Sequence, residues 1–103
     1  MKALYQNTYG LHVIDVQGTE FVPGLNITRG VTYKDGKVAE DCRTWTVRHH
    51  SGWNIRSGIS DGFSSKRKAT AYAKRIAPLT DWTQHESVLA HDRELFVALM
   101  DIV

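Results

Sequence analysis

The stretch WTVRHHSGWNIRSG, residues 45–58, decides the fold, because its side chains alternate on both sides of a Ser-Gly turn. Successive side chains of a strand point to opposite faces, so the stretch predicts a β-hairpin with one apolar and one polar face. The face predicted to be buried carries Trp45, Val47, Trp53 and Ile55. The face predicted to be exposed carries Thr44, Thr46, Arg48, Asn54 and Arg56.

The residues before this hairpin predict further strands and tight turns. Residues 11–16 are rich in β-branched side chains, and residues 26–33 resume a β-type pattern after the turn signal Pro23-Gly24. Asp35-Gly36 is a favoured dipeptide of two-residue hairpin turns, so residues 31–34 are expected to pair with residues 37–40. Residues 1–42 therefore predict a small antiparallel meander.

The residues after the hairpin predict helices. A helix capped by Ser64 or Ser65 is expected to end at Pro78, and its apolar stripe is Ala69, Tyr72, Ala73, Ile76 and Ala77. A second helical segment is expected after Trp82, where residues 83–86 fit a capping box. The segment is either one helix or two helices with a break near His91-Asp92.

Length and pattern together predict one α+β domain over residues 1–103. The expected architecture is an antiparallel sheet of about five strands, packed by one or two helices, with a C-terminal amphipathic helix. Three parts follow each other: a β-rich part over residues 1–42, a basic ββα module over 43–78, and an acidic amphipathic helical segment over 79–103.

Charge is unevenly distributed along a chain whose net charge is only +2. Residues 43–76 contain eight basic side chains and one acidic side chain, whereas residues 77–103 contain one basic and five acidic side chains. A strongly basic segment in a weakly charged chain is typical of a surface that meets a polyanion. The alternative interpretation is that the basic and acidic segments neutralise each other's charge within the fold.

Basic side chains at the expected helix start strengthen the first interpretation. Lys66, Arg67 and Lys68 fall where the helix dipole is already positive, which is unfavourable for stability but attracts phosphate groups. The predicted nucleic-acid-binding residues, for DNA or RNA, are Arg48, Asn54, Arg56, Lys66, Arg67 and Lys68. The alternative is a protein-interaction module that binds an acidic surface of a host protein and inhibits it.

Metal and catalytic sites have weaker support. The chain has one cysteine, Cys42, and no C-x2-C or H-x3-H pair, and adjacent His49 and His50 are expected on opposite strand faces. Residue types alone would allow two catalytic triads. One is Cys42 with His49 and Asp41, and the other is Ser87 with His91 and Asp92. No family signature supports either triad. We therefore expect no metal, no cofactor and no enzymatic activity.

The C-terminal segment ends with bulky apolar side chains, which predicts docking on the sheet or on a second copy of the chain. The residues expected at a homodimer interface are Leu95, Phe96, Leu99 and Met100. The chain contains no apolar run of membrane-spanning length and no signal peptide, so a cytoplasmic location without membrane contact is expected. For a phage protein this would be the cytoplasm of the bacterial host.

The hairpin, followed by FSSKRKATAYAKRIAPLTDW at residues 63–82, resembles the arm-type DNA-binding domain of tyrosine recombinases. It is also similar to short uncharacterised proteins of actinobacteria and their phages. The resemblance covers residues 43–82. It implies a sheet face that enters the major groove of DNA, with Arg48, Asn54 and Arg56 at the contacting positions. No recombinase catalytic domain is present, and an acidic apolar helix follows instead. A small non-enzymatic accessory protein, with a phage as one possible source, is the function expected.

Overall fold

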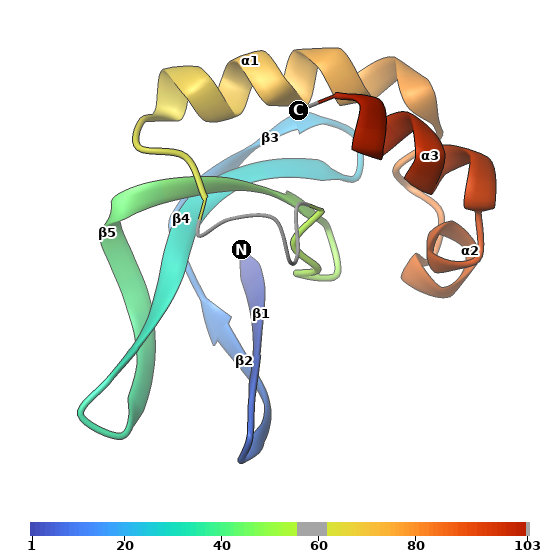
Figure 1. Ribbon diagram of the computed structural model, residues 1–103. Coiled ribbons are helices and arrows are strands. Elements are labelled where there is room, and N and C mark those ends of the chain that lie inside the picture. The colour runs from blue at the N-terminus through green and yellow to red at the C-terminus, as the bar shows by residue number, and fades with distance from the viewer. Residues whose placement is uncertain (56–61, 103) are drawn as a thin grey trace.

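Five strands in two antiparallel sheets and three α-helices build the molecule (Figure 1). The computed structural model describes residues 1–55 and 62–102. One sheet pairs β1 (Lys2–Asn7) with β2 (Gly10–Asp15), and the other has the order β3 (Gly18–Val22), β4 (Leu25–Lys34), β5 (Lys37–His49). The helices are α1 (Lys66–Ile76), the short 3-10 helix η1 (Ala77–Leu79), α2 (Glu86–Ala90) and α3 (Arg93–Asp101). The predicted α+β class and strand number are confirmed, although the strands form two sheets.

The predicted turns are present where the sequence places them. Asp35 and Gly36 both have positive φ, 53° and 77°, as the two central residues of a tight hairpin turn require, and Lys34 pairs with Lys37 across it. Gly24 joins β3 to β4 with a φ of 86°. A Cβ atom at Gly24 would collide with the backbone carbonyl of Trp82, so this turn also fixes the approach of the helical segment.

The main core lies between the three-stranded sheet and the helices. Figure 1 shows α1 across one face of the sheet, and it shows α2 and α3 near the C-terminal end of α1. Trp82 is 1% exposed, and its indole Nε1 donates a hydrogen bond to the Ile76 carbonyl at the end of α1 (3.2 Å). The core residues are Leu25, Ile27, Val47, Ile55, Ala69, Tyr72, Ala73, Ile76, Trp82, Leu89, Leu95 and Leu99.

The opposite face of the sheet is covered by the β1–β2 hairpin, and this corrects a prediction. The face of β5 that was expected to meet solvent is buried, with Thr46 2% and Arg48 3% exposed. The Leu4 backbone N–H of β1 donates to the Gly52 carbonyl (3.1 Å), which attaches the hairpin to the turn after β5. Polar side chains inside this interface hydrogen-bond each other, as in the bond from Thr46 Oγ1 to Asn54 Oδ1 (3.1 Å).

The chain after the turn at residues 50–52 forms less regular structure than predicted. His49 N–H donates to the Trp53 carbonyl (2.9 Å), and Arg48 and Asn54 form an isolated bridge. Residues 53–55 therefore pair with β5 at single points and make no strand of their own. Arg56, for which a DNA contact was predicted, lies outside the described residues.

Helix boundaries follow local capping chemistry. Ser65 caps α1 as predicted, because its Oγ accepts a hydrogen bond from Lys68 N–H (3.2 Å). The capping box expected from Thr83 is wrong: α2 begins at Glu86 and is capped by His85. Of the two alternatives for the C-terminal segment, the structure has two helices with a break near His91-Asp92, where the Asp92 carboxylate accepts from Leu95 N–H (3.0 Å) and caps α3.

The predicted homodimer residues of α3 divide between core and surface. Leu95 and Leu99 are 3% and 5% exposed and pack in the core, so the prediction that they form an intermolecular interface is wrong. Phe96 and Met100, on the outer side, are 37% and 69% exposed. None of the helices in the described part of the chain has the length and apolar character needed to span a membrane.

Candidate nucleic-acid interface

The solvent side of α1 is densely cationic. Its sequence, KRKATAYAKRI, contains five basic residues and no acidic residue. The apolar side chains of Ala69, Tyr72, Ala73 and Ile76 face the sheet, and every basic side chain is exposed. We call this surface the basic face; it consists of Lys66, Arg67, Lys68, Lys74 and Arg75.

The charge of the basic face is not neutralised by acidic neighbours within the described residues. The ion pair that occurs among the described residues joins Arg43 to Asp41 (3.3 Å), and both of these residues lie on β5, outside α1. Lys68 Nζ instead donates a hydrogen bond to Ser64 Oγ (3.1 Å), a neutral partner. Three cations in the first turn oppose the helix dipole, which typically costs some tenths of a kcal/mol for each. Helix stability therefore does not explain their presence.

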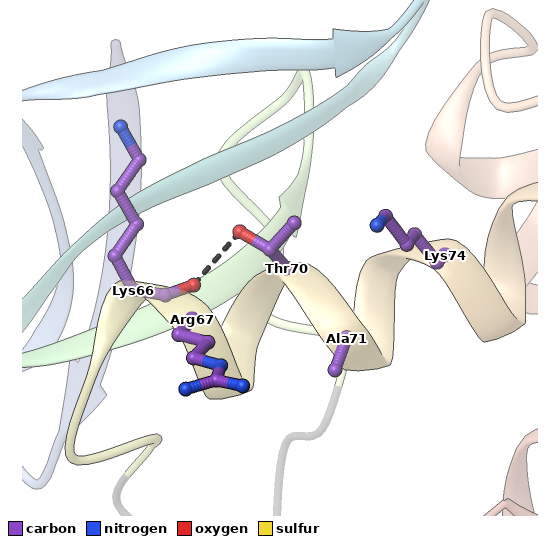
Figure 2. Close-up of a pocket in the computed structure, with 5 residues that line it drawn as sticks. All are labelled: Lys66, Arg67, Thr70, Ala71 and Lys74. Atoms are coloured by element: carbon purple, nitrogen blue, oxygen red, sulfur yellow. Dashed lines mark hydrogen bonds between the residues drawn. The ribbon is translucent and has the colours of Figure 1, made fainter.

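A shallow depression of about 420 Å³ lies on the basic face (Figure 2). Thr70 and Ala71 form its small-residue centre, and the Thr70 hydroxyl is turned back to the Lys66 carbonyl (2.8 Å). Lys66 and Arg67 bound the depression toward the start of α1, and Lys74 bounds it toward the end. The surface is thus low in the middle of the helix and positively charged at both ends.

An arginine from the sheet extends the positive charge beyond α1. Arg29 of β4 pairs across the sheet with Trp45 of β5, and its Cζ lies 4.1 Å from the Trp45 ring centroid. Lys66 Nζ lies over the same ring at 5.3 Å. Arg29 Nη1 also donates to the Cys42 carbonyl (2.8 Å), which fixes the guanidinium in place. Cation–π contact and this hydrogen bond hold Arg29 and Lys66 near each other despite their like charge.

The predicted binding residues fall into two groups. Lys66, Arg67 and Lys68 lie together on the exposed start of α1. Asn54 lies on the β1–β2 side of the sheet, where it accepts from Thr46 and lines a depression with Leu4 and other residues of that side. Arg29 was not predicted from the sequence, and Lys74 and Arg75 were not among the predicted binding residues. The spacing of Arg67 and Lys74, seven residues apart, was the available signal for a shared helix face.

Arg48 has a structural role and does not reach the surface. Its Nε donates to Thr28 Oγ1 (3.1 Å) and its Nη1 to the Gly52 carbonyl (2.9 Å), between the two sheets. Burial lowers the pKa of its guanidinium to about 10, so it is still protonated at neutral pH. The prediction that Arg48 contacts DNA from an exposed sheet face is therefore wrong.

His49 is fully buried at the end of β5 and connects the turn to the start of α2. Its Nε2 lies 2.7 Å from the Gln84 carbonyl, which can only accept, so Nε2 carries the proton. Its Nδ1 accepts from Ser51 N–H (3.1 Å), and Ser51 Oγ donates to Glu86 Oε2 (3.0 Å). Desolvation lowers the pKa of His49, and the adjacent His50 ring, 4.0 Å away, acts in the same direction.

Acidification is expected to destabilise the protein through His49. In the unfolded chain His49 titrates near pH 6.5, and in the folded chain its pKa is lower, so the unfolded state binds more protons below about pH 6.5. The free energy of unfolding should therefore fall more in the wild type than in His49→Gln between about pH 7.5 and 5.5. Urea denaturation at both values measures this. Exposed His91→Gln is the matched control and should keep the wild-type dependence; equal pH dependence in His49→Gln would contradict the account.

The arrangements considered for metals and catalysis are not assembled. Both ring nitrogens of His49 are engaged, and within residues 1–55 and 62–102 no group of three or more His, Cys, Asp or Glu side chains could hold a metal ion. Ser87 Oγ lies against His85 Nδ1 (2.9 Å), and His91 Nδ1 lies against the Ser87 carbonyl (2.6 Å). Neither contact gives a serine hydroxyl paired with His91.

Comparisons with known proteins found no match: no protein-family model, no curated protein and no solved structure matches this chain. The features of the molecule that bear on its function are therefore the geometry and charge of the basic face.

Proposed function

We propose that this protein binds nucleic acid through the basic face of α1, extended by Arg29, and acts without catalysis. The observation that carries the proposal is a solvent face whose charged residues are all cationic, on a helix whose first turn would be more stable with acidic residues. Side chains that are unfavourable for the helix and form no ion pair with the acidic residues that the structure describes are well suited to an external polyanion. Phosphate groups of a nucleic acid supply such charges at regular spacing.

Two further features support a phosphate ligand. Arg29 and Lys66 come from different elements, yet both are held over the Trp45 ring, so two charges are presented with restricted freedom. Preorganised cations lose less conformational entropy on binding than free surface side chains. The low centre at Thr70 and Ala71 lets a phosphate-bearing surface approach the helix between charged ends.

Salt dependence tests the proposal. Arg67→Ala should weaken oligonucleotide binding and reduce the slope of log K against log salt by about one, because one phosphate contact is lost. Arg93→Ala on the exposed side of α3 removes the same charge outside the basic face and should leave the slope unchanged. Fluorescence anisotropy with labelled oligonucleotides, from about 50 mM salt upward, measures both.

Two outcomes would contradict the proposal. Absence of salt-sensitive binding to any DNA or RNA at low salt is the first, and equal effects of Arg67→Ala and Arg93→Ala are the second. The alternative partner, an acidic host protein surface, would use the same basic face. In that case oligonucleotides should fail to bind.

A further inference from the structure

We infer that the ligand is B-form duplex DNA and that α1 itself enters the major groove. This inference rests on the proposed function and specifies its substrate class. It also reverses the binding mode implied by the recombinase resemblance, in which a sheet face reads the groove. The sheet face is occupied here by the β1–β2 hairpin, and its arginine, Arg48, is buried.

The cations of the basic face stand on both flanks of α1. At about 100° per residue, Lys66 lies at one edge of the exposed arc, Lys68 and Arg75 lie at the other edge, and Arg67 and Lys74 lie between them. Figure 2 shows Lys66 and Arg67 pointing to opposite sides of the helix. A single phosphate strand would need cations on one side only. Two flanks of positive charge match the two phosphate strands that border a groove.

Arg67 and Lys74, seven residues apart, lie near the centre of the exposed arc, and the depression with Thr70 and Ala71 lies between them along the helix. Ala71 is exposed and Thr70 is partly exposed, and both are small, so α1 can enter a groove while the long Arg67 and Lys74 side chains point toward its floor. The major groove of B-DNA is about 12 Å wide, which admits a helix of about 10–12 Å diameter. The 11 residues of α1 extend about 16 Å, or roughly five base pairs at 3.4 Å each.

Single strands and duplex RNA fit this surface less well. Binding of single strands usually depends on aromatic side chains that stack on bases. Tyr72, the one aromatic residue of α1, faces the core, and the Trp45 ring already has Arg29 and Lys66 over it. The major groove of A-form RNA is deep and narrow and does not admit a helix. Duplex DNA is therefore the form that accommodates both flanks.

The acidic helices restrict how the duplex can lie. Figure 1 shows α2 and α3 near the C-terminal end of α1, and their exposed acidic residues include Glu94 and Asp101. Phosphates that continued along the α1 axis in that direction would be repelled. The DNA is therefore expected to approach the start of α1, where Lys66, Arg67 and Lys68 are clustered.

A panel of probes with the wild-type protein tests the inference. Duplex DNA, the same sequence as duplex RNA, and each single strand are compared by anisotropy at equal salt. Duplex DNA should bind at least 10-fold more tightly than the other probes. DNA with glucosylated hydroxymethylcytosine, which fills the major groove, should bind at least 10-fold more weakly, and netropsin in the minor groove should have little effect.

The panel separates failure of the inference from failure of the proposed function. Similar affinity for all probes, or unchanged affinity for the filled groove, would overturn major-groove binding while nucleic-acid binding stands. No binding to any probe would overturn both.

A steric substitution gives an independent test. Ala71→Phe adds bulk to the exposed depression between Arg67 and Lys74 without changing charge, and should lower duplex DNA affinity at least 10-fold. Val97→Phe, at an exposed position of α3, is the control and should bind like the wild type. Circular dichroism verifies that both variants fold. Wild-type affinity in a folded Ala71→Phe variant would overturn the insertion of α1 into a groove.

Discussion

Replacement of Lys66, Arg67 and Lys68 together by glutamate is expected to lower duplex DNA affinity at least 100-fold and to leave the fold no less stable. The loss follows because three phosphate contacts are removed and three negative charges are placed against the phosphate strands. The retained stability follows because acidic side chains in the first turn favour the helix dipole, by about 0.3 kcal/mol or more for each. Ser65, which caps the same turn, is unchanged.

The comparison requires a variant with the same net charge. Lys34, Lys37 and Arg93 are exposed outside α1, and their joint replacement by glutamate changes the charge of the protein equally. This control should reduce affinity by less than about 10-fold, through long-range repulsion alone, which salt screens. Anisotropy gives the affinities and urea denaturation gives the free energies of unfolding. Equal loss of affinity in the two triple variants would mean that overall charge, and no particular face, controls binding.

Arg48→Ala is expected to have the opposite pattern, a large loss of stability with little change in affinity. Removal of the buried guanidinium leaves a cavity between the two sheets and deprives Thr28 Oγ1 of its donor and the Gly52 carbonyl of one of its two donors. Losses of this kind typically cost about 3 kcal/mol or more. The β1–β2 hairpin should be loosened most, because its Leu4 carbonyl also lies near the same guanidinium.

Arg48→Lys keeps the charge and provides a second test if the alanine variant unfolds. A lysine ammonium is a single donor centre and cannot reproduce the planar fork of arginine, so stability should still fall measurably. Denaturation at low temperature measures the loss, and anisotropy on the folded fraction should give the wild-type salt slope. A reduced slope with unchanged stability would mean that Arg48 contacts phosphate, as the recombinase resemblance implied.

The parts of the fold that depend on neighbouring residues could be predicted from the sequence. The Asp35-Gly36 turn, the Ser65 cap, the α1 stripe and the break before α3 are set by local backbone geometry and helix periodicity. Alternation within β5 correctly separated the two faces of the strand. It could not indicate that the β1–β2 hairpin would cover the polar face, because the polar residues there are paired by partners distant in sequence.

In the candidate site, too, the residues that are neighbours in sequence could be predicted, and the residue brought in by strand pairing could not. Lys66, Arg67 and Lys68 are consecutive, so their clustering at a helix start needs only the helix. Arg29 comes close to Lys66 only through the pairing of β4 with β5, which no local pattern specifies. Similarly, α3 has apolar side chains on more than one side, and periodicity alone did not distinguish core Leu95 from exposed Met100.

The central claim is that the basic face of α1 is the surface that meets nucleic acid. Titration of isotopically labelled protein with a short DNA duplex, followed by backbone amide NMR, tests it most directly. The account predicts that the largest chemical-shift changes fall on residues 66–75 and Arg29, and that the tip of the β4–β5 hairpin and α3 change little. Changes concentrated on β1–β2 or α3, or no changes at low salt, would contradict it.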